Sequence, residues 1–289
     1  MKPLGAAVTS LLIGLVTIDT ASGVDSNNTT TATLRVRPIG GSYFLCRAVN
    51  HSQKTIKFRD ADILFHNGNG FEYHQLSRAE RFSSFLGALT ESPDEPPSLV
   101  IAPGKMYRRE VGREDEGAWK REFPGQYVAL NWYMDSLRSP TIYVGFTDEA
   151  GKIALPVVED KDASVRAILA FVYQDKKAPE LSFLILNGTK TSVVMTEPLV
   201  QKSTIRASAP AIQYTRELVL PKAEAKMTKV EPGKVAEWRL PWQTVLDLIP
   251  KEDLAKIEAA GGDLDLVWKV GEFESPILPL SLGRPDEGK

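Results

Sequence analysis

Five side chains between residues 60 and 74 are the best candidates for metal chemistry in this sequence. They are Asp60, Asp62, His66, Glu72 and His74. Carboxylates and imidazoles are ligands of divalent transition metals, and the Asn67-Gly68 pair between the two histidines favours a tight hairpin that would bring them together. A zinc site would also need a third ligand within reach. We favour the alternative, an exposed polar hairpin face, and therefore predict no metal site.

Catalytic motifs are scarce elsewhere. The sequence holds three histidines, the last at position 74, and it lacks Gly-x-Ser-x-Gly, His-Glu-x-x-His and Gly-Lys-Ser motifs. Cys46 is the single cysteine, so no intrachain disulfide can form. We predict that Cys46 fills space in a core and is not a nucleophile. The sequence thus predicts a non-enzymatic protein without a cofactor; the alternative is an exported hydrolase or metal-dependent enzyme with its site on loops.

Two stretches of the first half are candidates for partner binding. Ser77 and Glu80 form a capping box before an apolar face, which predicts a helix with Arg78 and Arg81 facing outward. Its alternative role is to plug one end of the core. Trp119 lies in a mixed run of acidic and basic residues, and aromatic residues beside arginine are common binding hot spots. Its alternative role is to cover the edge of the core.

The first 23 residues resemble an export signal. Lys2 precedes an apolar stretch from Leu4 to Ile18, and the small residues Ala21-Ser22-Gly23 offer a cleavage site. An uncleaved N-terminal anchor is the competing interpretation, although the stretch is short for a membrane span. No later apolar run approaches that length. We therefore expect an exported protein located in the periplasm, at the cell surface or outside the cell, with no membrane span in the mature chain.

Charge narrows the class of partner. The formal net charge is -2 over 289 residues, so the chain lacks the basic excess that neutralises nucleic-acid phosphates. A protein or a cell-envelope polymer is the partner that this composition favours.

Short runs rich in β-branched and aromatic residues, separated by glycine, proline, asparagine or aspartate, predict an all-β fold. In the first half they are Thr31–Val36, Tyr43–Val49, Thr55–Phe58, Ile63–Phe65, Leu99–Ile101, Tyr127–Trp132 and Thr141–Phe146. In the second half they are Arg166–Tyr173, Ser182–Leu186, Thr191–Met195, Leu199–Val200, Glu217–Leu220, Val235–Leu240, Leu264–Val270 and Ile277–Leu282. Each half also contains one predicted helix, after Ser77 and over Pro250–Ala260.

Three landmarks occur twice in the same order. They are a strand-like run ending at Asn50 or Asn187, a Pro-Gly-Lys turn at 103–105 or 232–234, and a tryptophan, Trp132 or Trp268, seven residues before Ser-Pro. A period of about 130 residues indicates a duplicated domain, because solenoid repeats are much shorter. Aligning the two asparagines places Cys46 opposite Phe183 on the inward face of a strand. The two tryptophans are predicted core anchors.

This order of landmarks, with the Gly-x-Tyr-x-x-x-x-Trp strand at 125–132, resembles tandem bacterial immunoglobulin-like or fibronectin-type sandwiches. The resemblance implies two tandem Ig-like β-sandwich domains from an internal duplication, each with a short helical insertion. It covers nearly all of 31–284. We expect a signal peptide at 1–23, domains at 24–148 and 163–284, a linker at 149–162 and a tail at 285–289. The chain lacks the paired cysteines of antibody domains, and its tryptophans lie on a late strand.

Overall fold

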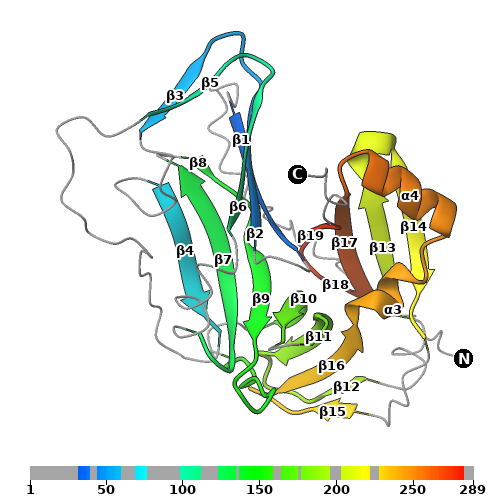
Figure 1. Ribbon diagram of the computed structural model, residues 1–289. Coiled ribbons are helices and arrows are strands. Elements are labelled where there is room, and N and C mark those ends of the chain that lie inside the picture. Colours follow the sequence, from blue (N-terminus) through cyan, green and yellow to red (C-terminus); the bar gives the residue numbers. More distant parts are fainter. Residues whose placement is uncertain are drawn as a thin grey trace, which may run out of the picture.

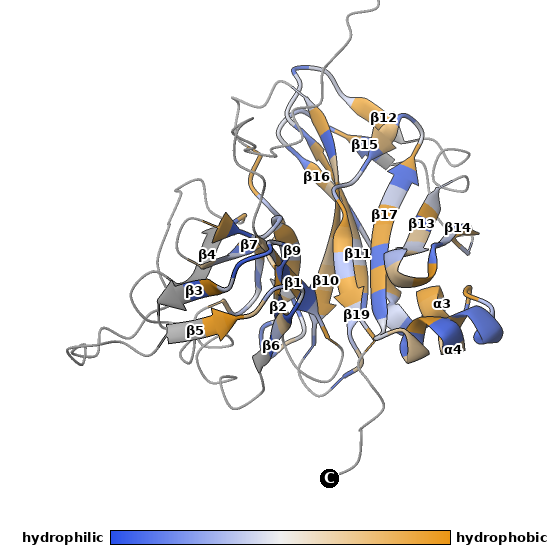
Figure 2. Cartoon of the chain, turned by 90° about the horizontal axis from the view of Figure 1, so that it is seen from above, coloured by the Kyte–Doolittle hydropathy of each residue, from blue (hydrophilic) through white to orange (hydrophobic). Residues whose placement is uncertain are grey.

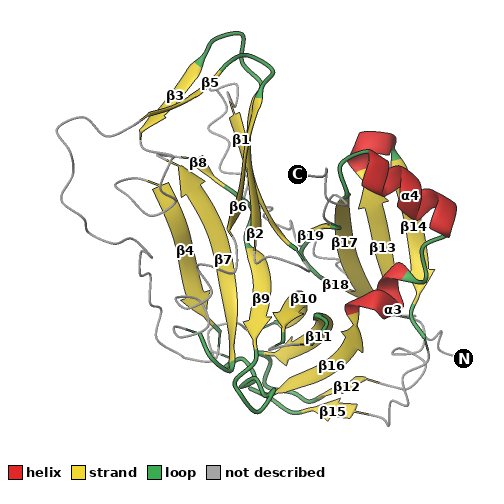
Figure 3. Ribbon diagram, in the orientation of Figure 1, coloured by secondary structure: helices red, strands yellow, loops and turns green. Residues whose placement is uncertain are grey.

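The computed structural model describes residues 32–39, 44–59, 69–76, 98–111, 123–134, 137–158, 164–174, 177–195, 203–221 and 228–282. Strands dominate this part of the chain and helices are few (Figure 3). The prediction of an all-β fold is therefore confirmed.

The described part of the first half, on the left in Figure 1, contains nine strands. They are β1 (Ala32–Pro38), β2 (Phe44–Asn50), β3 (Ile56–Arg59), β4 (Asn69–Gln75), β5 (Ser98–Ile101), β6 (Met106–Val111), β7 (Gln126–Met134), β8 (Leu137–Arg138) and β9 (Ile142–Phe146). One sheet has the order β1-β2-β6, β3 pairs with β5, and β7 lies between β4 and β9 with β8 paired to its end. All pairs inside this half are antiparallel.

The second half repeats this arrangement with additions. Its strands are β10 (Val165–Tyr173), β11 (Glu180–Asn187), β12 (Val193–Met195), β13 (Thr204–Ala209), β14 (Tyr214–Val219), β15 (Thr228–Val230), β16 (Val235–Pro241), β17 (Asp263–Val270), β18 (Phe273–Glu274) and β19 (Leu278–Ser281). The order β10-β11-β16 matches β1-β2-β6, and β12 pairs with β15 as β3 pairs with β5. Strand β17 lies between β13 and β19, with β18 paired to its end and β14 beyond β13.

The two halves are joined by two parallel contacts between strands. The last strand of the first half, β9, pairs with β10, the first strand of the second half, with Val172 opposite Gly145. This pairing makes one seven-stranded sheet across the halves. Conversely, Ile39, at the end of β1, forms a parallel bridge with Ser281 of β19. In each half, therefore, the end of the first strand pairs with the last strand of the other half.

Hydrophobic side chains form one core inside each half and a third cluster between them. The first core includes Cys46 and Trp132, and the second includes Phe183 and Trp268; all four are 0–3% exposed. Cys46 is therefore the core residue that the sequence predicts. Asp263 and Asp265 alternate with buried leucines along β17, and the alternation of hydrophilic and hydrophobic residues is visible in Figure 2.

Two helices follow β16 on the outside of the second half (Figure 3). They are α3 (Trp242–Leu246) and α4 (Lys251–Ala259). Pro250 is the N-cap of α4, and Gly261 and Gly262 have positive φ angles immediately after it. The helix predicted over Pro250–Ala260 is confirmed, with Pro250 one position earlier than its expected first-turn place. The sequence did not predict α3.

Asn50 and Asn187 make the same hydrogen bonds in the two halves. The Asn50 Nδ2 group donates to the carbonyls of Lys54 and Ile101, both at 2.8 Å, and Asn187 Nδ2 donates to those of Thr191 at 2.9 Å and Val230 at 2.8 Å. Each Oδ1 accepts from the backbone N–H and hydroxyl of the residue two places on, Ser52 or Thr189. Each asparagine therefore ties the end of its strand to a neighbouring hairpin.

The Pro-Gly turns and the tryptophans are also equivalent. Gly104 and Gly233 have φ angles of +65° and +69°, as the predicted turns require. Each donates its N–H to the carbonyl of the asparagine in its own half, at 3.0 and 2.8 Å. The backbone N–H of Trp132 donates to the Ser139 hydroxyl at 2.9 Å, and that of Trp268 donates to the Ser275 hydroxyl at 3.0 Å.

The segment predicted as a linker is partly packed. Ala154 N–H donates to the Gly125 carbonyl at 2.8 Å, Val157 N–H donates to that of Leu76 at 2.7 Å, and Val158 is 8% exposed. The first part of 149–162 therefore runs along the surface of the first half.

Candidate functional site

A cavity of about 120 Å³ lies between the two sheets of the second half, at the side where β16 borders the sandwich. Its lining is Phe183, Ser203, Leu220, Pro221, Trp238, Arg239, Leu240, Trp268 and Val270. Three aromatic rings make its apolar wall: the Trp268 ring lies 5.2 Å from that of Phe183 and 6.4 Å from that of Trp238, both edge-on. Such an aromatic, mostly apolar concavity is typical of binding sites.

Strand β16 is an edge strand among the described residues, and its outer edge lies beside this cavity. Asn187 N–H donates to the Lys234 carbonyl and Trp242 N–H donates to that of Pro179, each at 3.0 Å, at the two ends of the β11–β16 ladder. Opposed residues of an antiparallel ladder alternate between bonded and unbonded pairs, so Val235, Glu237 and Arg239 direct their backbone N–H and C=O groups away from β11. Within the described residues β16 pairs with β11 alone.

The first half has different residues at the same positions of its ladder. Counting from the paired asparagines and from the Pro-Gly-Lys turns, the cross-strand pair Phe183 and Trp238 corresponds to Cys46 and Arg109. The tryptophan that is common to both halves is therefore joined by two further aromatic rings in the second half. The sequence shows this difference as Arg109 and Trp238, each four residues after the lysine of its turn, but alternation alone does not distinguish their roles.

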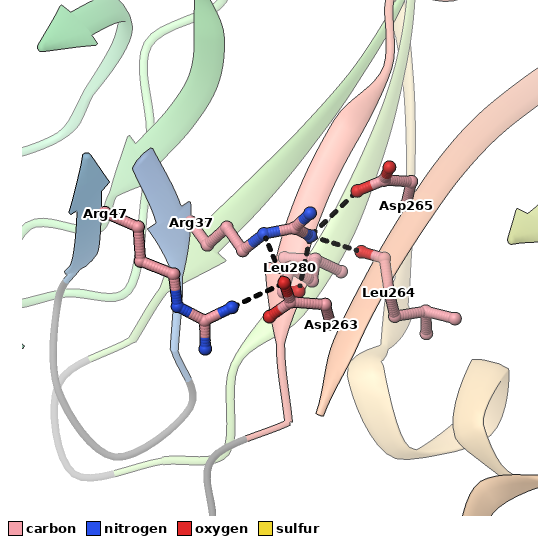
Figure 4. Close-up of polar contacts among 6 residues, drawn as sticks. All are labelled: Arg37, Arg47, Asp263, Leu264, Asp265 and Leu280. Carbon is pink, nitrogen blue, oxygen red and sulfur yellow. Dashed lines mark hydrogen bonds and ion pairs between the residues drawn. The ribbon is translucent and has the colours of Figure 1, made fainter. Parts of the chain in front are cut away.

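Two polar clusters hold the halves together, and the first consists of charges (Figure 4). Arg37 of β1, 1% exposed, places Nη1 2.7 Å from Asp265 Oδ1 and donates to the carbonyls of Leu264 and Leu280 at 3.3 and 3.0 Å. Arg47 of β2 places Nη1 2.5 Å from Asp263 Oδ2, and Arg37 Nε lies 3.5 Å from that oxygen. Burial lowers the pKa of Arg47, and the Asp263 carboxylate opposes this shift. Two arginines and two aspartates neutralise one another there.

The second cluster centres on Tyr127 of β7. Its hydroxyl donates to Glu237 Oε1 and lies 2.8 Å from the Ser182 hydroxyl, which itself donates to Glu237 Oε1 at 2.9 Å. Arg239 Nε reaches the same oxygen at 2.6 Å. Burial, together with the Glu237 carboxylate, raises the pKa of Tyr127 above its ordinary 10.0. The network leaves Tyr127 protonated and Glu237 bound by three donors, an arrangement that suits a fixed junction between the halves.

Tyr127 and Asp263 occupy equivalent places in the two halves, five residues before Trp132 and Trp268. Tyr127 is the second residue of β7 and Asp263 is the first residue of β17, and each contacts the second strand of the other half, β11 or β2. The two clusters therefore occupy equivalent positions in the two halves. One consists of the hydrogen-bond network of Tyr127 with apolar residues, and the other consists of charged residues.

The residues predicted for partner binding, Arg78, Arg81 and Trp119, lie outside the described residues, as do Asp60, Asp62 and His66 of the proposed metal constellation. Glu72 and His74 lie on β4, two positions apart. Within the described ranges, no group of three or more histidine, cysteine, aspartate or glutamate side chains could hold a metal ion.

No helix in the described ranges has the length and apolar character to cross a membrane.

Comparison with known proteins gives no family. No protein-family model matches the chain, and no curated protein matches its sequence. Among solved structures, the chain is similar to red sea bream transglutaminase, with 9% sequence identity and a TM-score of 0.22. The match covers 90% of this chain and 32% of that one, so this chain spans about a third of the transglutaminase length. A likeness at this level carries no argument about fold or activity.

Proposed function

We propose that this chain is an exported, non-enzymatic binding protein built from two Ig-like sandwich domains that arose by duplication. The aromatic cavity beside the free edge of β16 is its partner site. The observation that carries the proposal is the grouping of Phe183, Trp238 and Trp268 around an open space, because aromatic anchors in desolvated pockets dominate the binding energy of protein interfaces.

The duplication is supported by detail that chance resemblance does not supply. Matching asparagine, Pro-Gly and tryptophan hydrogen bonds recur with matching strand orders. In each half three strands, β1-β2-β6 or β10-β11-β16, pack across a hydrophobic core from a layer built around the tryptophan strand, and this layering resembles that of an Ig-like sandwich. Duplicated cores keep their packing while exposed sites diverge with use.

A binding site in the second copy alone is consistent with divergence of the two copies after duplication. At the ladder position where the second copy has Phe183 and Trp238, the first copy has Cys46 and Arg109. The second copy has therefore acquired, or kept, the aromatic wall. Export is supported by the sequence pattern of the first 23 residues.

The test is a crosslinking pull-down from the envelope fraction with the mature chain and two variants. Trp238→Arg gives the second copy the residue of the first. Arg206→Gln changes an exposed residue on β13 that pairs with Glu274 and serves as the matched control. We expect the same partner to be recovered by the unaltered chain and by Arg206→Gln, and recovery to fall at least about tenfold with Trp238→Arg.

Unchanged melting temperatures in both variants show that any loss is local. Equal recovery by all three proteins would remove the aromatic cavity from the site. Recovery of no partner by the unaltered chain would count against a binding function.

A further inference from the structure

We infer that the partner enters this site as an extended, uncharged peptide strand, which pairs with the free edge of β16 and places one apolar side chain in the aromatic cavity. This inference rests on the proposed function and adds the chemistry of the partner and the geometry of its binding.

The edge supplies the hydrogen bonds. Val235, Glu237 and Arg239 direct three N–H and three C=O groups away from β11, as the phase of the ladder requires. No proline interrupts residues 235–240, so every outward N–H in that range can donate. Unpaired edges of this kind recruit extended peptides by adding a strand to the sheet.

The cavity supplies the side-chain pocket. Trp238 and Leu240 point into the sandwich from β16 and remain only half-buried, although they pack against the second core. The volume of about 120 Å³ is comparable with apolar cavities of about 150 Å³ that bind benzene. It therefore accepts one phenyl ring or one branched aliphatic side chain.

Charge selects against ionic partners. Glu237 and Arg239 are the charged residues among the three whose backbone groups face outward, and their side chains pair with each other in the junction with Tyr127, with Nε and Oε1 2.6 Å apart. Neither side chain is therefore free to form an ion pair with an acidic or basic residue of a partner strand. A small apolar molecule would fill the cavity alone, whereas a peptide also forms hydrogen bonds with the outward backbone groups of Glu237 and Arg239.

The probe is a seven-residue capped peptide in which threonine alternates with valine around a central phenylalanine. Two matched peptides accompany it: one has aspartate in place of the phenylalanine, and the other has N-methyl groups on the amides that would face β16. Binding to the mature chain is followed by the indole resonance of Trp238 and by hydrogen exchange of the amides of Val235, Glu237 and Arg239.

We expect the parent peptide to slow exchange at those three amides at least about tenfold and to shift the Trp238 resonance. The aspartate peptide binds about 30-fold more weakly because it cannot fill the cavity. The N-methyl peptide loses the protection because it cannot complete the ladder.

Strand addition is overturned if the edge amides remain unprotected when the parent peptide saturates the protein. It is also overturned if millimolar parent peptide neither protects these amides nor shifts the Trp238 resonance. If the pull-down still depends on Trp238 in that case, the binding function stands and the strand geometry falls. If the pull-down also fails to depend on Trp238, both fall.

Discussion

Arg37 is a charged side chain that the fold buries almost completely. Its guanidinium joins Asp265 and two backbone carbonyls of the second half, at distances from 2.7 to 3.3 Å. Buried ion pairs add little net stability when both partners are present, but removing one partner leaves the others unpaired in a medium of low dielectric. The arginine therefore contributes mainly to specificity, because an alternative contact between the halves would leave its buried charge unpaired and would be higher in free energy than the native junction.

Replacing this arginine tests that view. We predict that Arg37→Met lowers the free energy of unfolding by roughly 3–5 kcal/mol, because the apolar side chain keeps the volume but leaves the Asp265 carboxylate without its arginine partner. Arg206→Met, which breaks the exposed pair with Glu274, should cost about 1 kcal/mol or less. Urea denaturation of both variants measures the difference. Equally small losses in the free energy of unfolding would contradict this prediction and show that water reaches the junction around Arg37.

Tyr127 gives the junction a dependence on alkaline pH. Burial and the Glu237 carboxylate raise the pKa of Tyr127 in the folded protein, whereas in the unfolded chain it is near 10. The unfolded chain therefore releases this proton first, so the stabilisation is fully present below pH 10 and is lost as the pH rises above it.

The corresponding experiment compares the wild type with Tyr127→Phe between pH 8 and pH 11. At pH 8 the variant should be less stable by roughly 1.5–3 kcal/mol, because a hydrogen bond to a charged acceptor is lost. Above pH 10 its stability should fall less steeply than that of the wild type. Parallel curves over the whole range would show that Tyr127 does not carry the alkaline dependence.

The elements depend on a few side chains that fasten strand ends. Asn50 and Asn187 are both fully buried, and each bonds two carbonyls and two donors around its turn. We predict that Asn187→Ala lowers the free energy of unfolding by about 2–4 kcal/mol, since it leaves the buried Val230 carbonyl and the Thr189 N–H unpaired. Asn50→Ala should cost a similar amount if the two halves are equivalent. Chemical denaturation of both variants measures this, and a loss near zero in one half would break the equivalence.

Local patterns predicted most of these elements. Runs of β-branched, aromatic and other apolar residues between turn residues identified the strands that carry Cys46, Phe183, Trp132 and Trp268. Strict alternation was not needed, because β11 is buried on both faces from Leu181 to Asn187. Proline and glycine predicted the helix after Pro250, where the cap and the stop are both local features. The recurrence of Asn50 and Asn187 was visible in the sequence, but its cause was not, since their partners come from hairpins 43 to 51 residues away.

The candidate site could not be predicted in this way. It depends on the phase of the β16 ladder and on the packing of Trp238 against Trp268, which lie on opposite sheets. Alternation alone assigns Trp238 and Leu240 to a core and cannot show that the sandwich remains open beside them. The parallel contacts between the halves are equally nonlocal, because they join residues 27 and 242 positions apart.

At the scale of the molecule, the two halves close on each other. Val172 opposite Gly145 and Ile39 opposite Ser281 are equivalent pairs, so each half extends an edge of the other. A third hydrophobic cluster reinforces the closure, with Tyr127 and Val158 packed against Ile168, Ala170 and Leu184. The halves are thus predicted to behave like the subunits of a two-fold dimer fused into one chain.

The measurement that tests this closure most directly is cleavage of the connection between the two halves. Residues 159–163 of the mature chain are replaced by the recognition sequence of a specific protease, and the cut protein is analysed by size-exclusion chromatography with light scattering. We predict a single species with the mass of the uncut chain, which separates into two fragments only in denaturant. Two folded fragments that elute separately in native buffer, each at about half the mass, would contradict it.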